Sequence, residues 1–117
     1  MAITEVRDDD YCIQYESSSA TAIFEGKLSL RGPAEYAPIA DLLESVVLSE
    51  PEHLTLNLQK LQFLNSSGIR VLSKFIFNLK KKTEIRVTVL GTKDIAWQSK
   101  SLKNLKKFMP ELTLTIE

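Results

Sequence analysis

The stretch that decides the fold is FLNSSGIRVLSKFIF, residues 63–77. An apolar pair precedes an asparagine, two serines and a glycine, and an amphipathic run follows them. Asn and Ser side chains pair with the N–H groups that a helix leaves without backbone partners at its start. The stretch therefore predicts the end of a strand, a helix cap at Asn65 or Ser66, and a helix over residues 66–81.

The two adjacent hydroxyls also suit a modified serine. Unpaired N–H groups at a helix start favour an anion, and a phosphoserine there adds roughly −2 charge. Gly68 would leave room for the backbone of a partner. Arg70 follows Ser66 by four residues, a spacing at which it can reach a phosphate on Ser66. The turn is consistent with a plain cap and with a phosphorylation site that a partner recognises.

The helix behind the serines is amphipathic. At about 100° per residue its apolar residues share one arc of about 160°; they are Ile69, Val71, Leu72, Phe75, Ile76 and Leu79. Phe77 lies outside this arc, near Arg70 and Lys74 and on the side of Ser66. Phe77 either belongs to a partner surface or packs against the basic helix near the C-terminus or the N-terminal tail, and both interpretations stay open.

The N-terminal part of the chain predicts a hairpin and a helix. Apolar residues alternate with polar ones over residues 11–16 and 20–29, and a run of three serines separates the two stretches. Pro33 and Pro38 suit the first turn of a helix because proline lacks an N–H donor, so we expect a regular helix only from about Tyr36 or Pro38.

The C-terminal part alternates between strands and helices. Residues 53–58, 85–90 and 112–116 have the alternation of strands. Residues 95–109 predict a basic amphipathic helix. Its expected apolar side carries Ile95, Leu102, Leu105, Phe108 and Met109, opposite Lys100, Lys103 and Lys107, with Lys106 near the apolar side.

The resulting fold class is α/β, with the order β-β-α-β-α-β-α-β. Strands separated by single helices favour parallel pairing, and the N-terminal hairpin adds an antiparallel partner. We therefore expect a mixed β-sheet with helices packed on it. The 117 residues are enough for one compact domain, 1–117, in which residues 1–10 form a loose lead-in.

Several function classes are disfavoured by composition. No apolar run approaches the roughly 20 residues of a membrane span, and the acidic N-terminus does not resemble a secretory signal. The single Cys12 excludes an internal disulfide and fits a reducing cytoplasm. The only histidine is His53, and no Gly-x-Ser-x-Gly elbow, metal-ligand spacing or phosphate-cradling glycine loop is present. The sequence therefore predicts no enzyme, no cofactor and no metal.

Charge is unevenly placed along the chain. Residues 1–69 hold 4 basic and 11 acidic side chains, and residues 70–117 hold 11 basic and 4 acidic ones. Such asymmetry can mark an interaction face. The interpretation we favour from the sequence is that the halves neutralise each other within one domain. We expect no nucleic-acid partner, because the basic half has no Arg-rich motif.

The stretch LTLNLQKLQFLNSSGIRVL, residues 54–72, resembles the signature of STAS domains, the anti-sigma factor antagonists. In that family a strand leads through Asp-Ser-Ser/Thr-Gly into an apolar helix. FEGKLS, residues 24–29, stands where the family usually has a Gly-x-Leu element. The order of elements is similar as well, so the resemblance extends over nearly the whole chain.

The resemblance implies a partner-switching regulator. A protein serine kinase, often itself the anti-sigma factor, phosphorylates the first serine after the aspartate, a phosphatase reverses this, and the unmodified form binds the kinase-like partner. By motif position the phosphorylated serine is Ser66, with Ser67 as the second hydroxyl. The expected partner surface consists of Asn65, Ser66, Ser67, Gly68, Arg70, Lys74 and Phe77.

Asn65 departs from the family pattern. It replaces the family's aspartate, keeps its size and its ability to cap, and removes a charge beside Ser66. The alternative is therefore a constitutive interaction scaffold that is not phosphorylated. For either function we expect a monomer or weak dimer in the cytoplasm, with no membrane contact.

Overall fold

The computed structural model describes residues 4–82 and 84–117; of residues 80–82 it describes the backbone only. In chain order the elements are β1 (Glu5–Arg7), β2 (Tyr11–Glu16), β3 (Thr21–Leu28), α1 (Gly32–Leu48), β4 (His53–Leu64), α2 (Ser66–Lys82), β5 (Arg86–Gly91), α3 (Ala96–Ser101), the 3-10 helix η1 (Leu102–Lys107) and β6 (Thr113–Ile116).

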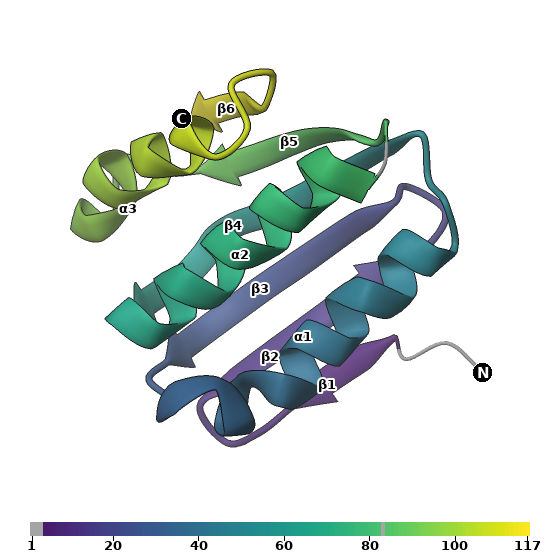
Figure 1. The fold of residues 1–117 in the computed structure, drawn as a ribbon. Coiled ribbons are helices and arrows are strands. Elements are labelled where there is room, and N and C mark those ends of the chain that lie inside the picture. The colour runs from purple at the N-terminus through teal and green to yellow at the C-terminus, as the bar shows by residue number, and fades with distance from the viewer. Residues whose placement is uncertain (1–3, 83) are drawn as a thin grey trace.

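The strands form one six-stranded sheet whose spatial order, β1-β2-β3-β4-β5-β6, is also the chain order. β1, β2 and β3 pair antiparallel, and β3, β4, β5 and β6 pair parallel through the helical connections. Figure 1 shows α1, α2 and α3 packed on one face of this sheet. The expected mixed α/β sheet with helices packed on it is confirmed.

The core lies between the sheet and the helices. Side chains that alternate along the strands point to the helical face, among them Ile13, Phe24, Leu56 and Val89, and they are at most 1% exposed. The intervening strand positions are more polar and only half-buried, as at Thr55 and Asn57 in β4. The helices therefore cover the face of the sheet that carries the buried side chains (Figure 1).

The N-terminal lead-in is shorter than expected. We expected residues 1–10 to be loose, but Glu5–Arg7 form the edge strand β1, with Glu5 opposite Gln14. A three-residue strand is too short to show an alternating pattern in the sequence. Residues 1–3 lie outside the described residues.

The first helix begins earlier than expected. α1 starts at Gly32 instead of Tyr36 or Pro38, and Pro38 lies inside it. Pro38 and Ala34, whose carbonyl would pair with the residue at 38, are both exposed. Water can therefore reach the carbonyl that Pro38 leaves without a donor, which lowers the cost of an internal proline.

β4 is longer than its alternating pattern, because a bulge interrupts the alternation. Ile23 pairs with Asn57 and Glu25 pairs with Lys60. Between these two pairs β4 advances by three residues, whereas β3 advances by two. Its buried leucines consequently fall three residues apart, at Leu58, Leu61 and Leu64.

The expected helix over residues 95–109 is divided. A short α3 is followed by the 3-10 helix η1. Leu102, Leu105 and Met109 are buried as expected, but Phe108 is 39% exposed, so its assignment to the apolar side was wrong. The tighter turn of a 3-10 helix rotates later residues away from α-helical positions.

α3 completes the edge of β4 that β5 leaves unpaired. β5 pairs only with residues 53–57 of β4. The buried amide of Gln98 donates to the carbonyls of Leu58 and Leu61, at 2.6 and 3.0 Å, and Trp97 Nε1 donates to the carbonyl of Gln62 at 3.1 Å. Side chains thus hold the second half of β4, which leads into the serines.

Candidate functional site

The serine turn, residues 65–68, joins β4 to α2. The Gly68 N–H donates to Asn65 Oδ1 at 2.9 Å, and the Ile69 N–H donates to the Asn65 carbonyl at 3.0 Å. Asn65 is therefore the cap of α2, which confirms one of the two capping residues expected from the sequence.

The amide of Asn65 is also tied to the interior. The Tyr36 hydroxyl donates to Asn65 Oδ1 at 2.7 Å, and Asn65 Nδ2 donates to the Leu30 carbonyl at 2.8 Å. Tyr36 is 1% exposed, and this burial raises the pKa of its phenol, which therefore stays protonated as a donor at neutral pH. These contacts hold the turn against the start of α1.

Sequence reasoning missed Tyr36. The residue stands 29 positions before Asn65, and no local pattern links the two. The available signal was its spacing: Tyr36 precedes Ile39 and Leu43 by three and seven residues, on the buried stripe of α1.

Gly68 serves the interior instead of a partner. It is buried, and a Cβ at this position would overlap Leu64 Cδ1 and lie 2.7 Å from the Tyr36 hydroxyl. The missing side chain therefore makes room for Leu64 and Tyr36. This corrects the expectation that Gly68 leaves space for the backbone of a partner.

The two serines differ in exposure. Ser66, the first residue of α2, is exposed, whereas Ser67 is half-buried. Ser67, Arg70 and Lys74 line a shallow hollow of about 200 Å³ beside Gly32 and Pro33 at the start of α1. We call it the α1–α2 hollow.

The α1–α2 hollow continues into a groove between the two helices. The groove has a volume of about 330 Å³ and shares Pro33, Val71 and Lys74 with the hollow. Its walls also include Leu43 and Phe75, so its lining is largely apolar. The structure therefore brings Ser67, Arg70 and Lys74 together beside an apolar groove, with Ser66 exposed next to them.

Phe77 lies apart from this hollow. Its ring packs edge-on against Phe108, with centroids 6.4 Å apart and an interplanar angle of 83°. Of the two interpretations left open by the sequence, contact with the basic C-terminal segment is observed. Phe77 nevertheless remains 40% exposed, so this contact leaves part of its ring accessible.

The single histidine, His53, and the two serines of the turn stand at opposite ends of β4. Residues 4–82 and 84–117 contain no group of three or more His, Cys, Asp or Glu side chains placed to hold a metal ion. His53 Nε2 lies 2.6 Å from Thr88 Oγ1. His53 opens β4, whereas the serines follow the other end of this 12-residue strand, so His53 is not placed to act as their base.

No helix in the described part of the chain has both the length and the apolar character needed to cross a bilayer.

Comparison with known proteins gives one family and several similar structures. The STAS domain model matches residues 28–113. SiaC of Pseudomonas aeruginosa has a TM-score of 0.74 at 15% identity, over 100% of this chain and 98% of SiaC. A chain in the crystal structure of the P. aeruginosa diguanylate cyclase SiaD with its activator SiaC has a TM-score of 0.73 at 13% identity, over 98% and 100%. An anti-sigma factor antagonist from Mycobacterium paratuberculosis has a TM-score of 0.64 at 18% identity, over 95% and 90%. No curated protein sequence matches the chain.

Proposed function

The chain belongs to the STAS domain family, and from this premise we propose that it is a non-enzymatic, cytoplasmic partner-switching regulator controlled by reversible phosphorylation of Ser66. In this proposal a protein serine kinase of the anti-sigma type adds the phosphate and a serine phosphatase removes it. The unmodified form binds the partner, through a surface that includes Ser66, Ser67, Arg70 and Lys74.

The observation that carries the proposal is that capping and exposure fall to different residues of the serine turn. Asn65 caps α2 and is held by Tyr36 and Leu30, whereas Ser66 is exposed. A phosphate on Ser66 would therefore not displace the capping contact. It would also stand at the N-terminal end of a 17-residue helix, where the helix dipole favours negative charge.

The basic side chains near the turn give the switch its physical effect. Arg70 is exposed and follows Ser66 by one helical turn, and with Lys74 it borders the α1–α2 hollow. A phosphate would change the local charge by roughly −2 and compete for both cations. A partner that recognises the uncharged serine or these cations would bind the modified form less well.

The partner class is suggested by proteins of the same fold. One similar structure is named as an anti-sigma factor antagonist, and SiaC is named as the activator of a diguanylate cyclase. Both names describe proteins that act on another protein. A regulated protein partner is therefore proposed here, and neither a sigma factor nor a cyclase is assigned.

The proposal is tested by phosphate transfer. A cognate kinase with ATP is expected to add one phosphate to the wild-type chain and to Ser67→Ala, and none to Ser66→Ala, as read from intact mass. Ser67→Ala is the matched control, because it removes the neighbouring hydroxyl. Phosphate that persists on Ser66→Ala would refute the assignment of the site.

A second candidate function is supported by Asn65. Its Nδ2 donates to the Leu30 carbonyl, which an aspartate in the same position could not do. Under this alternative the asparagine is a structural adaptation in a constitutive scaffold that is not phosphorylated. A chain isolated from its host without phosphate under any growth condition, yet still in complex with a partner, would favour the scaffold.

A further inference from the structure

An exposed surface on η1 and α2 remains outside the proposed switch. Two aromatic rings, Phe77 and Phe108, pack edge-on there and are each about two-fifths exposed. The segment that leads to Phe108, formed by α3 and η1, carries four exposed lysines, namely Lys100, Lys103, Lys106 and Lys107. We call these six residues the aromatic–lysine face.

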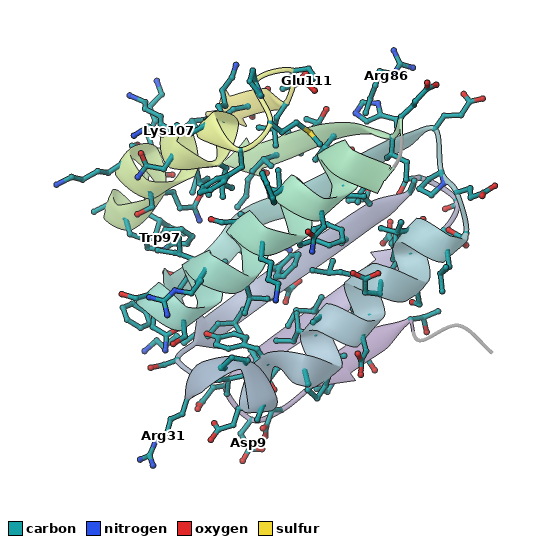
Figure 2. All side chains as sticks on the ribbon, in the orientation of Figure 1. Asp9, Arg31, Arg86, Trp97, Lys107 and Glu111 are labelled. Carbon is teal, nitrogen blue, oxygen red and sulfur yellow. The ribbon has the colours of Figure 1, made fainter. Side chains whose placement is uncertain are left out.

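The lysines of this face are not neutralised within the described chain. The ion pairs found among its described residues join Arg7 to Glu5 and Lys60 to Glu25, and none reaches α3 or η1. In Figure 2 nitrogen-tipped side chains, Lys107 among them, project outward from α3 and η1. The four positive charges are therefore available to an outside group.

The fold keeps the acidic half of the chain away from this face. Because the strand order follows the chain order, residues 1–69 form the β1 side of the sheet and residues 84–117 form the β6 side. The two ion pairs found among the described residues both lie within residues 1–69, so neither of them joins the two halves. That the halves neutralise each other within one domain stays a prediction. The charge asymmetry of the sequence is an asymmetry of the surface.

We propose that the aromatic–lysine face binds an acidic protein segment that places an apolar side chain against Phe77 and Phe108. Aromatic groups at the centre of a contact, surrounded by polar groups that exclude water, supply most of the binding energy at protein interfaces. Four unpaired lysines give the complementary rim, since opposite charge speeds association and selects the partner.

Two other classes of ligand fit less well. The bases of a nucleic acid stack on exposed ring faces. In the edge-on pair of Phe77 and Phe108, the edge of one ring points at the face of the other, so that face is not open to a base. A lipid surface requires a wide apolar helix face. The apolar side chains of this segment, Leu102, Leu105 and Met109, are instead buried in the core at 2–4% exposure, so they are not available to a membrane. The exposed apolar surface is limited to the rings of Phe77 and Phe108, which is enough to contact one or two apolar side chains of a partner.

This inference deepens the proposed function, on which it rests for the existence of a protein partner, by naming the partner's chemistry. Ser66 and Phe77 lie 11 residues apart on α2, or about 16 Å along the helix axis. That distance is about two Debye lengths at physiological ionic strength, so a phosphate on Ser66 has little effect at Phe77. The face therefore acts as a constant anchor, while the serine turn acts as the switch.

The test is a selection of displayed random 16-residue peptides on the full, unmodified chain. The enriched peptides are expected to carry net negative charge and at least one Leu, Met or Phe. Their affinity is expected to fall about tenfold or more in the double variant Lys103→Glu/Lys107→Glu, and to weaken as salt rises. The matched control Lys27→Glu/Arg86→Glu reverses two exposed cations of β3 and β5 that take part in neither of the ion pairs found among the described residues, and it should change affinity less than twofold.

Several results of the same selection would overturn the proposed binding of an acidic segment. Failure to enrich peptides, enrichment of neutral or basic peptides, or acidic peptides insensitive to Lys103→Glu/Lys107→Glu would each overturn the inference. Tighter binding to a 20-base-pair DNA or to phosphatidylserine vesicles than to any selected peptide would overturn it in favour of those ligands. None of these results depends on Ser66, so failure of the inference is distinguishable from absence of phosphate on Ser66.

Discussion

The serine turn and the aromatic–lysine face share helix α2, but they are built in opposite ways. In the turn, Asn65 and Gly68 make their contacts inward, with Tyr36, Leu30 and Leu64. On the face, the lysine side chains have no acidic partner among the described residues. Substitution of Asn65 or Gly68 should therefore reduce stability, whereas substitution of the lysines on the face should alter recognition alone.

The largest effect is expected for Asn65→Ala. The change removes the cap of the Gly68 N–H, the acceptor of the buried Tyr36 hydroxyl and the donor to the Leu30 carbonyl. Loss of a cap and of a partner for a buried hydroxyl should lower the free energy of unfolding by about 2–3 kcal/mol. Urea denaturation measures this change.

Ser66→Ala is the matched control for that prediction. Ser66 is adjacent in sequence but exposed, and the cap contact comes from Asn65. Its loss should change the free energy of unfolding by less than about 0.5 kcal/mol, as for other surface substitutions. A similar loss in both variants would mean that the turn is not anchored through Asn65, and the contrast with the face would disappear.

Gly68→Ala tests whether the serine turn is packed against the interior at Gly68. In an exposed helix this change gains up to about 1 kcal/mol. Here the added Cβ would overlap Leu64 Cδ1 and approach the Tyr36 hydroxyl. We expect a net loss of about 1–3 kcal/mol, because overpacking forces neighbours to shift. The loss should be smaller when Gly68→Ala is made in a Tyr36→Phe background, and a thermodynamic cycle from urea denaturation measures that coupling. Additive effects would show that Tyr36 does not confine Gly68.

The fold could be predicted from the sequence wherever residues close in the chain determine it. Alternation and helical spacing predicted the strands β2 to β6 and the helices, and NSSG predicted the cap, since each depends on neighbours within a few residues. The extension of β4 was hidden because the bulge opposite Ile23 and Glu25 replaces alternation by a three-residue spacing of leucines.

The parts of the site that the sequence did not reveal depend on contacts between distant residues. The Tyr36 hydroxyl reaches Asn65 across 29 positions, and Trp97 reaches the Gln62 carbonyl across 35. The role of Gly68 depends on that same tyrosine. Phe108 was assigned to the core because an α-helical period was applied to a segment that is a 3-10 helix.

Tyr36→Phe tests the inward anchoring of the turn more gently. The variant keeps the ring but loses the hydroxyl that donates to Asn65 Oδ1, which still accepts from the Gly68 N–H. The expected loss at neutral pH is about 1 kcal/mol, the net value of one hydrogen bond. Urea denaturation at pH 7 measures it, and no loss would mean that the hydroxyl does not anchor Asn65.

The same variant gives a prediction for alkaline pH. Burial raises the pKa of Tyr36 in the folded chain above its ordinary value of 10.0. The unfolded phenol therefore ionises first, so the stability that depends on the protonated phenol is complete below pH 10 and is lost as the pH rises through the folded pKa. Between pH 9 and pH 11, roughly one unit on either side of the ordinary value, the wild type should lose more unfolding free energy than Tyr36→Phe. Parallel curves would indicate that Tyr36 ionises equally in both states.

The smallest effect on stability is expected for Lys103→Glu/Lys107→Glu, the variant that should most weaken acidic peptides. Both lysines are exposed and, within residues 4–82 and 84–117, have no acidic partner. Their reversal breaks no ion pair there and relieves repulsion with Lys100 and Lys106. The free energy of unfolding should stay within about 0.5 kcal/mol of wild type. A loss above 1 kcal/mol in urea denaturation would mean that these lysines support the fold. Weakened peptide binding could then no longer be attributed to charge, and the separation between a turn that stabilises and a face that recognises would fail.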